Sequence, residues 1–370
     1  MANSDLPVGA GETTANPETT MLQDGRAKDR SACLGLGFAG WQLCAVACGG
    51  TPLPGASRQT AFPVMLSDHS RSANQKVPAL SANEIPSSLA SAIGLFRHPR
   101  RGLSDPAQMP RIERSLTAAK IDMAWLADYR ECVGLPPGEH ALPPLVLQIA
   151  AAPLHLAILA DVQFPFRALG LVHMSQHVMQ TQAISPNASI DLLAHTTDAQ
   201  WEKRGMSFGL VTEARIDGEL VWRGTTRALA VGKSPLAAEP AKPRAHAIDL
   251  SKTPRIEQQI DVPENCGRRY AKIAGDLNPI HQHALLAKPF GLRRAIVHGT
   301  WTLARALAGT ELPNSDSFKF NATFVRAVEL PSKIWIRAYG EANDLPAQVL
   351  VQNQAGTTNH LIVEFEERIQ

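Results

Sequence analysis

The chain has 370 residues, of which 44% are hydrophobic, and its 36 Lys and Arg residues nearly balance 34 Asp and Glu residues. This length predicts two or three domains, and the apolar content is sufficient to build their cores. The net charge of +2 provides no general attraction to nucleic acid or to a membrane surface. Proteins that depend on a strongly basic field are therefore excluded.

The five cysteines show no metal-binding or redox spacing, and their odd number argues against a disulfide framework. A reducing compartment, and so a cytoplasmic location, is predicted. The most apolar early run, residues 33–50, is interrupted by glycines and is shorter than the roughly twenty residues of a membrane span. A signal peptide is the alternative, but the run begins only at Cys33 and follows several charged residues.

Residues 1–85 are rich in Gly, Ser, Thr, Ala, Pro and Asn and show no helical or strand period. Such a composition buries too little apolar surface to offset the entropy of ordering. The sequence Pro99-Arg-Arg-Gly102 then predicts a solvated basic loop. We expect residues 1–110 to form a largely disordered leader.

A regular pattern of elements begins at Arg111. A helix is predicted over 123–133, with Asp122 as its N-cap and Gly134 at its end. The apolar run 142–160 predicts a helix that is buried on most sides and interrupted at Pro153. Asp217-Gly218 predicts a hairpin between two strand-like runs. The strands expected in this part are 112–121, 174–184, 189–197, 205–216 and 220–231.

A Pro- and Ala-rich stretch, 234–243, predicts a linker that we extend to residue 249. The pattern then repeats. Short helices are expected at 263–274 and 280–288, and a buried helix at 299–308. The strands expected are 255–262, 318–328, 332–339, 347–351 and 359–366. A buried helix beside an antiparallel sheet thus occurs twice, which predicts an α+β protein with domains at 111–233 and 250–370.

The candidate chemistry lies between residues 270 and 299. Asp276, Asn278 and His281 are close in sequence, and Pro279 between them excludes the middle of a regular helix. Asn278, which precedes the proline, is pushed towards extended geometry. A carboxylate, an amide and an imidazole can therefore converge on one point, as acid–base catalysis requires.

This stretch resembles the MaoC-like dehydratases, also called hydratase 2 or (R)-specific enoyl-CoA hydratases. The residues that carry the resemblance are Tyr270, Ala271, Gly275, Asp276, Asn278, Pro279, Ile280, His281, His298 and Gly299. Ala274, His283, Leu292 and Ala295 depart from the usual pattern, which bears on pocket shape and substrate choice. Residues 144–231 resemble the inactive first half of two-domain members, through Phe164-Pro-Phe166, Gly170-Leu-Val-His173 and Phe208 with Thr212-Glu213.

The resemblance implies a double hot-dog fold, in which each antiparallel sheet wraps around a central helix and the two sheets pair edge to edge. It implies a hydro-lyase that interconverts trans-2-enoyl-CoA and (R)-3-hydroxyacyl-CoA, with Asp276 and His281 as the acid–base pair and Asn278 orienting water or substrate. Gly299 would donate its backbone N–H to the thioester oxygen, and Phe324 would lie beside the acyl thioester. An acyl-CoA substrate is implied, and a homodimer is compatible with this interpretation.

Two other functions remain open for this fold, because hot-dog domains also host acyl-CoA thioesterases and non-catalytic acyl-thioester binders. The sequence shows no dinucleotide, P-loop or metal motif, so no cofactor or metal is predicted. The remaining histidines of interest are predicted to have structural or local packing roles: His155, His173, His177 and His298. His283 is expected at the surface or next to the site residues without contacting the substrate.

Overall fold

The computed structural model describes residues 80–81, 100–138, 140–237, 253–310, 317–341 and 345–366. Most of the predicted leader and most of the predicted linker at 234–249 lie outside these residues. Within the described ranges, no helix is both long enough and apolar enough to cross a bilayer.

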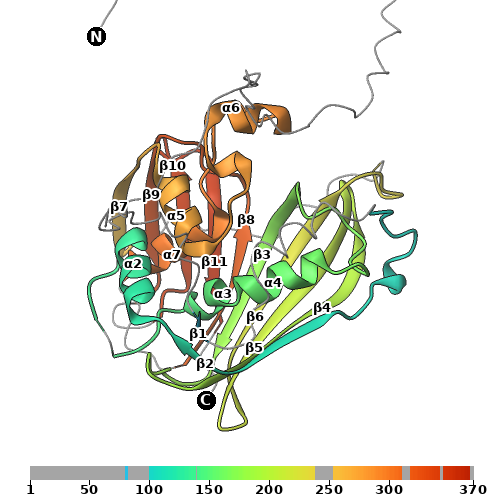
Figure 1. The fold of residues 1–370 in the computed structure, drawn as a ribbon. Coiled ribbons are helices and arrows are strands. Elements are labelled where there is room, and N and C mark those ends of the chain that lie inside the picture. The colour runs from blue at the N-terminus through green and yellow to red at the C-terminus, as the bar shows by residue number, and fades with distance from the viewer. Residues whose placement is uncertain are drawn as a thin grey trace, which may run out of the picture. The chain divides into compact units, whose positions relative to one another are not determined.

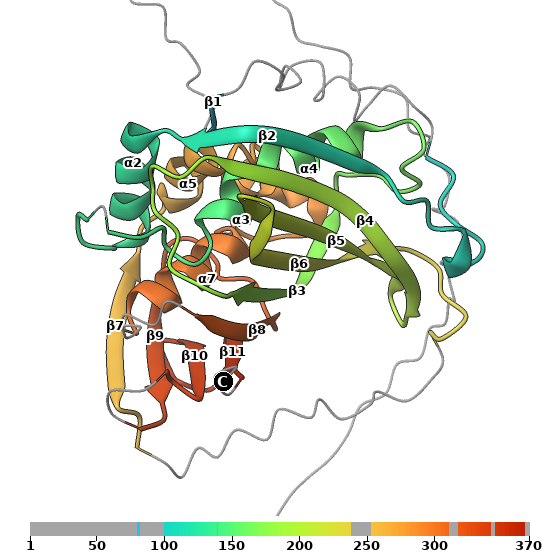
Figure 2. The same ribbon diagram turned by 90° about the horizontal axis from the view of Figure 1, so that it is seen from below.

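The described strands form one antiparallel sheet in the order β1-β2-β4-β5-β6-β3-β8-β11-β10-β9-β7 (Figures 1 and 2). The first half contains β2 (Glu113–Ile121), β3 (Leu171–Gln180), β4 (Ile190–Glu202), β5 (Gly205–Ile216) and β6 (Glu219–Val231). The second contains β7 (Ile256–Val262), β8 (Phe318–Phe324), β9 (Ser332–Tyr339), β10 (Gln348–Asn353) and β11 (Asn359–Phe365). β1 (Leu80–Ser81) pairs with the end of β2.

The two halves repeat one topology. Within each half, the spatial order of the strands is first, third, fourth, fifth and second in chain order. The second strands of the halves, β3 and β8, pair antiparallel from Ser175↔Thr323 to Gln180↔Phe318. This pairing confirms the predicted edge-to-edge junction, which leaves neither of these two edges open.

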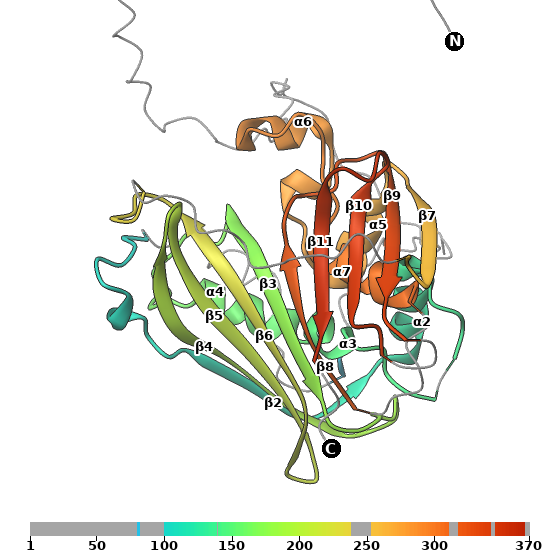
Figure 3. The ribbon, with the colours of Figure 1, turned by 180° about the vertical axis from the view of Figure 1, so that it is seen from behind.

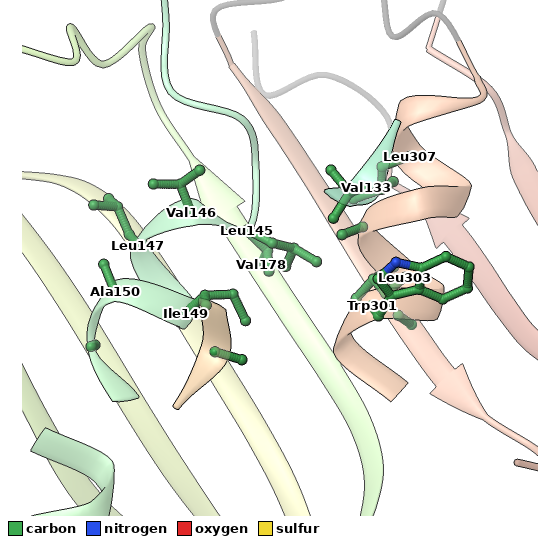
Figure 4. Close-up of a cluster of buried hydrophobic side chains, with 14 of the residues drawn as sticks. Val133, Leu145, Val146, Leu147, Ile149, Ala150, Val178, Trp301, Leu303 and Leu307 are labelled. Atoms are coloured by element: carbon green, nitrogen blue, oxygen red, sulfur yellow. The ribbon is translucent and has the colours of Figure 1, made fainter. Parts of the chain in front are cut away.

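Each half places helices against the concave face of its sheet (Figure 3). In the first half these are α3 (Val146–Ala150) and α4 (Ala152–Ala160), and in the second α7 (Gly299–Ala308). Side chains of α3 and α7 belong to one buried apolar cluster that also includes Val178 of β3 (Figure 4). A sheet wrapped around a central helix in each half confirms the double hot-dog fold.

The local sequence explains the helix ends. In α2 (Met123–Val133), the Asp122 carboxylate accepts a hydrogen bond from Trp125 N–H, and Gly134 ends the helix at φ 75°. The predicted break of the 142–160 run at Pro153 is wrong by two residues. The helix is interrupted at Ala151, and Pro153 occupies the first turn of α4, where its missing N–H costs no hydrogen bond.

Two other predictions require correction. The strand expected at 174–184 is β3, which starts earlier and ends earlier, because the pairing with β6 begins at Leu171↔Ala230. The basic loop is not fully solvated at Arg100. Its guanidinium donates to Phe164 O at 2.7 Å and to Leu159 O and Ala160 O at 3.3 Å. Arg100 therefore caps the carbonyl end of α4, where a cation is favourable.

Candidate active site

The site residues follow α5 (Cys266–Ala274) on an irregular segment. Gly275 ends α5 in the left-handed region at φ 70°, which turns the chain before Asp276. Asn278 is extended, with φ −51° and ψ 128°, as expected for a residue before proline. The short 3-10 helix η2 (Pro279–His281) then places His281 beside the start of α7.

The imidazole of His281 has a defined tautomer. Its Nδ1–H donates to Ile296 O at 2.8 Å, so Nε2 carries a lone pair. Nε2 lies 3.9 Å from Asp276 Oδ2, and the side chains are 10% and 52% exposed, respectively. That separation is too long for a direct hydrogen bond, and it allows one water oxygen to lie within hydrogen-bond reach of both atoms.

His298 completes the cluster. Its ring stacks on His281, with centroids 3.7 Å apart and an interplanar angle of 26°. Its Nε2–H donates to Asp276 O at 3.1 Å, whereas the buried Nδ1 has no hydrogen-bond partner. The edge of Tyr270 packs on the same ring, with centroids 5.2 Å apart. His298 thus holds both the backbone of Asp276 and the plane of His281.

Burial keeps both imidazoles neutral. Desolvation lowers the pKa of His281, and the Asp276 carboxylate only partly opposes this effect. Desolvation and the neighbouring His281 lower the pKa of His298. His281 therefore presents a free base at neutral pH.

Gly299 directly follows His298 in the chain, and Phe324 lies beside it. Gly299 is the first residue of α7, and within the described residues its N–H meets no acceptor. A Cβ on Gly299 would lie 3.0 Å from Phe324 Cε1. The Phe324 ring in turn packs on His173 of β3, with centroids 4.5 Å apart. The wall beside the free amide is therefore built from both halves of the sheet.

Asn278 is in the same segment, but its side chain is engaged locally. Its Oδ1 accepts from Ile280 N–H at 3.4 Å, and Asp276 Oδ1 accepts from Asn278 N–H at 3.1 Å. The structure therefore gives Asn278 a role in shaping the turn. Its predicted contact with water or substrate stays a prediction.

Within the described residues, Asp276, His281 and His298 have ligand atoms within 4.8 Å of one another, as a metal site would require. The two imidazole rings are stacked nearly parallel, however. His298 Nε2–H donates to Asp276 O, so this nitrogen offers no lone pair to a metal in this arrangement. The arrangement suits proton transfer better than metal binding.

Comparison with known proteins shows what this chain is similar to. Residues 247–354 match the family model of the MaoC like domain. This part of the chain is similar to a MaoC-like domain. The chain is also 28% identical over 226 residues to 3-hydroxyacyl-thioester dehydratase X from Mycobacterium tuberculosis. The alignment covers 61% of this chain and 79% of that protein.

Solved structures extend the match beyond the MaoC-like domain. The crystal structure of HtdX from M. tuberculosis matches with 25% identity and a TM-score of 0.59, over 68% of this chain and 98% of that one. A MaoC-like dehydratase from Phytophthora capsici matches with 14% identity and a TM-score of 0.56, over 71% and 98%. The second match shows a shared fold only.

His298 contacts the site residues more closely than the sequence predicts. It was predicted to pack locally, and it does pack, but on the imidazole of His281 and the backbone of Asp276. The available signal was its place immediately before Gly299, because the residue before a helix lies at the same end of that helix as the first backbone N–H groups.

Proposed function

We propose that this protein is a hydro-lyase that interconverts a trans-2-enoyl thioester and a (R)-3-hydroxyacyl thioester. The observation that carries the proposal is the 3.9 Å gap between Asp276 Oδ2 and the free Nε2 of His281. The similarity to a dehydratase of 3-hydroxyacyl thioesters supports the reaction class. The (R) configuration follows from the sequence resemblance to (R)-specific hydratases.

In the hydration direction, one water would bind between Asp276 and His281. His281 Nε2 takes a proton from this water while the oxygen forms a bond to C3, and Asp276 accepts the second water hydrogen in a hydrogen bond. The electrons of the C2–C3 double bond move towards the thioester carbonyl. C2 then receives a proton from the acid–base pair of Asp276 and His281. General acid–base catalysis of this kind contributes roughly 10²–10⁴-fold.

The negative charge that develops on the thioester oxygen requires a donor. The free N–H of Gly299 is suited to this role because it lies at the positive end of α7 and no Cβ blocks it. The half-buried Phe324 beside it supplies an apolar wall for the acyl group. Dehydration uses the same groups in reverse.

The test is the loss of the conjugated enoyl absorbance when the purified protein is mixed with an enoyl-CoA. We expect Asp276→Asn and His281→Ala to lower kcat by about 10²-fold or more. Asp261→Asn and His177→Ala are matched controls, because both side chains form ion-pair contacts elsewhere in the structure. An inert wild type, or full activity in both site variants, would reject the proposal. Release of free CoA without loss of the enoyl group would indicate a thioesterase instead.

A further inference from the structure

Positive charge is concentrated around the candidate site. The whole chain has 36 basic and 34 acidic residues, but residues 266–298 contain six Lys or Arg and a single acid, Asp276. Two of the six are engaged: Arg269 pairs with Glu131, and Arg268 donates to Gln282 O. The local excess of cations therefore belongs mainly to the segment that follows His281.

Residues 282–295, which we call the site loop, begin directly after His281 and end directly before Ile296, whose backbone contacts Ile280 and His281. Ile296 N–H donates to Ile280 O at 3.0 Å, and His281 Nδ1–H donates to Ile296 O at 2.8 Å. The loop contains α6 (Ala284–Ala287) and the 3-10 helix η3 (Lys288–Phe290). In Figures 1 and 3, α6 lies beyond the ends of the second-half strands, apart from the sheet.

The site loop exposes large apolar side chains. Leu285 is 64% exposed, Leu286 48% and Phe290 42%, and the nearby Leu277, which directly follows Asp276, is 61% exposed. These are four of the eight large hydrophobic side chains exposed in the described part of the chain. Exposed apolar side chains gathered within one segment, here residues 277–290, are typical of interaction surfaces, whereas isolated ones are not.

Three exposed cations accompany them: Lys288, Arg293 and Arg294. The loop contains no acidic residue, and among the described residues none of the three forms an ion pair. Lys319 and Lys333 elsewhere on the surface, in contrast, pair with Glu366 and Asp261. An apolar patch edged by unpaired charges of one sign is complementary to an acidic protein surface with apolar side chains of its own.

We propose that the site loop docks an acidic carrier protein, which delivers the acyl group to Asp276 and His281 as a thioester on a flexible arm. This proposal rests on the proposed function, since it names the carrier of the same substrate. The docking surface begins one residue from each catalytic side chain, at Leu277 and Gln282. A carrier bound there would hold the thioester within a short arm's reach of the site.

Two other occupants fit the loop less well. Nucleotide-bearing small molecules occupy concave sites, whereas the loop projects from the body and exposes its apolar side chains outwards. Helices that lie in a membrane interface need a long amphipathic face, and α6 spans only Ala284–Ala287.

The experiment compares one enoyl group on three carriers: an acidic acyl carrier protein, CoA and pantetheine. Two variants are needed, the charge variant Lys288→Glu/Arg293→Glu and the apolar variant Leu285→Gln/Phe290→Gln. We expect each to lower the ratio of kcat/KM for the carrier-protein substrate to that for the pantetheine substrate by about tenfold or more. Added salt should lower the same ratio in the wild type. Lys233→Glu, an exposed lysine of the first half, should leave the ratio intact.

Three outcomes overturn the proposal. If neither variant changes the ratio, the loop does not dock the carrier. A second outcome is that only the charge variant has an effect, and that it lowers kcat/KM relative to the pantetheine substrate as much for the CoA substrate as for the carrier-protein substrate. The cations then bind CoA phosphates. If the apolar variant loses binding to anionic lipid vesicles while the ratio is unchanged, the surface is membrane-facing. Absence of turnover with any thioester rejects the proposed function instead, and titration with a saturated acyl carrier protein then tests docking separately.

Discussion

Adding one methyl group at Gly299 should separate catalysis from stability. In Gly299→Ala, the new Cβ would lie 3.0 Å from Cε1 and 3.1 Å from Cδ1 of Phe324, so the ring must move by a few tenths of an ångström. The backbone N–H remains in this variant, but the methyl group would occupy the space beside it and keep the thioester oxygen out of hydrogen-bond reach. Loss of one such donor typically lowers kcat by about 10²–10³, or about 2.7–4 kcal/mol.

The free energy of unfolding should change much less. Overpacking costs about 1–3 kcal/mol in a tight core, but Phe324 is only half-buried and can shift. Alanine also stabilises a helix by roughly 0.5–1 kcal/mol relative to glycine, and Gly299 already has helical geometry. We therefore expect a net change of at most about 1–2 kcal/mol.

The assay is kcat for loss of enoyl absorbance, measured beside a thermal melt. Gly309→Ala is the matched control at the other end of α7, because its Cβ would meet only the flexible end of Gln258 at 3.1 Å and Ile336 Cδ1 at 3.5 Å, besides the helix backbone. If Gly299→Ala melts like the wild type and retains kcat within about threefold, well short of the 10²–10³ expected for a lost donor, the N–H of Gly299 is not the oxyanion donor.

The remaining predictions concern protonation, positioning and the core. The reaction rate should rise with pH and level off before neutrality, because burial lowers the pKa of His281 and its neutral form is the base; a pH profile of kcat checks this. The half-buried His155 and His173 have pKa values lowered to about 4, chiefly by desolvation, so the unfolded chain binds more protons below pH 6.5; stability should fall as the pH drops from 6.5 towards 4, as denaturant titrations at several pH values will show. His298→Phe should lower kcat about tenfold with little change in KM and should shift the pH profile, because it removes the hydrogen bond from His298 to the backbone carbonyl of Asp276. His298→Gln should recover part of the rate. Leu303→Ala, fully buried on α7, should cost about 2–5 kcal/mol of unfolding free energy in a denaturant titration, without a change in KM.

Where local chemistry decides the structure, the sequence was sufficient. Asp122 and Gly134 mark the two ends of α2, and Asp217 and Gly218 adopt the positive φ values, 52° and 85°, that a tight hairpin turn requires. The helix predicted at 299–308 has the observed bounds of α7. At α2 and at the hairpin, a cap or a turn residue specifies the boundary through a single hydrogen bond or backbone conformation.

Where distant contacts decide, the sequence was insufficient. The start of β3 depends on its pairing with β6. Arg100 contacts carbonyls about sixty residues away, at the end of α4. The stacking of His298 on His281 likewise requires the fold, because α7 must return to the loop after α5 before the rings can meet.

The pairing of β3 with β8 gives the first half a role at the candidate site even though it lacks an acid–base pair. Its edge strand carries His173, which packs on Phe324, and Phe324 in turn packs beside the free amide of Gly299. The wall of the candidate site is therefore built on the edge strand of the first half as well as on the second half.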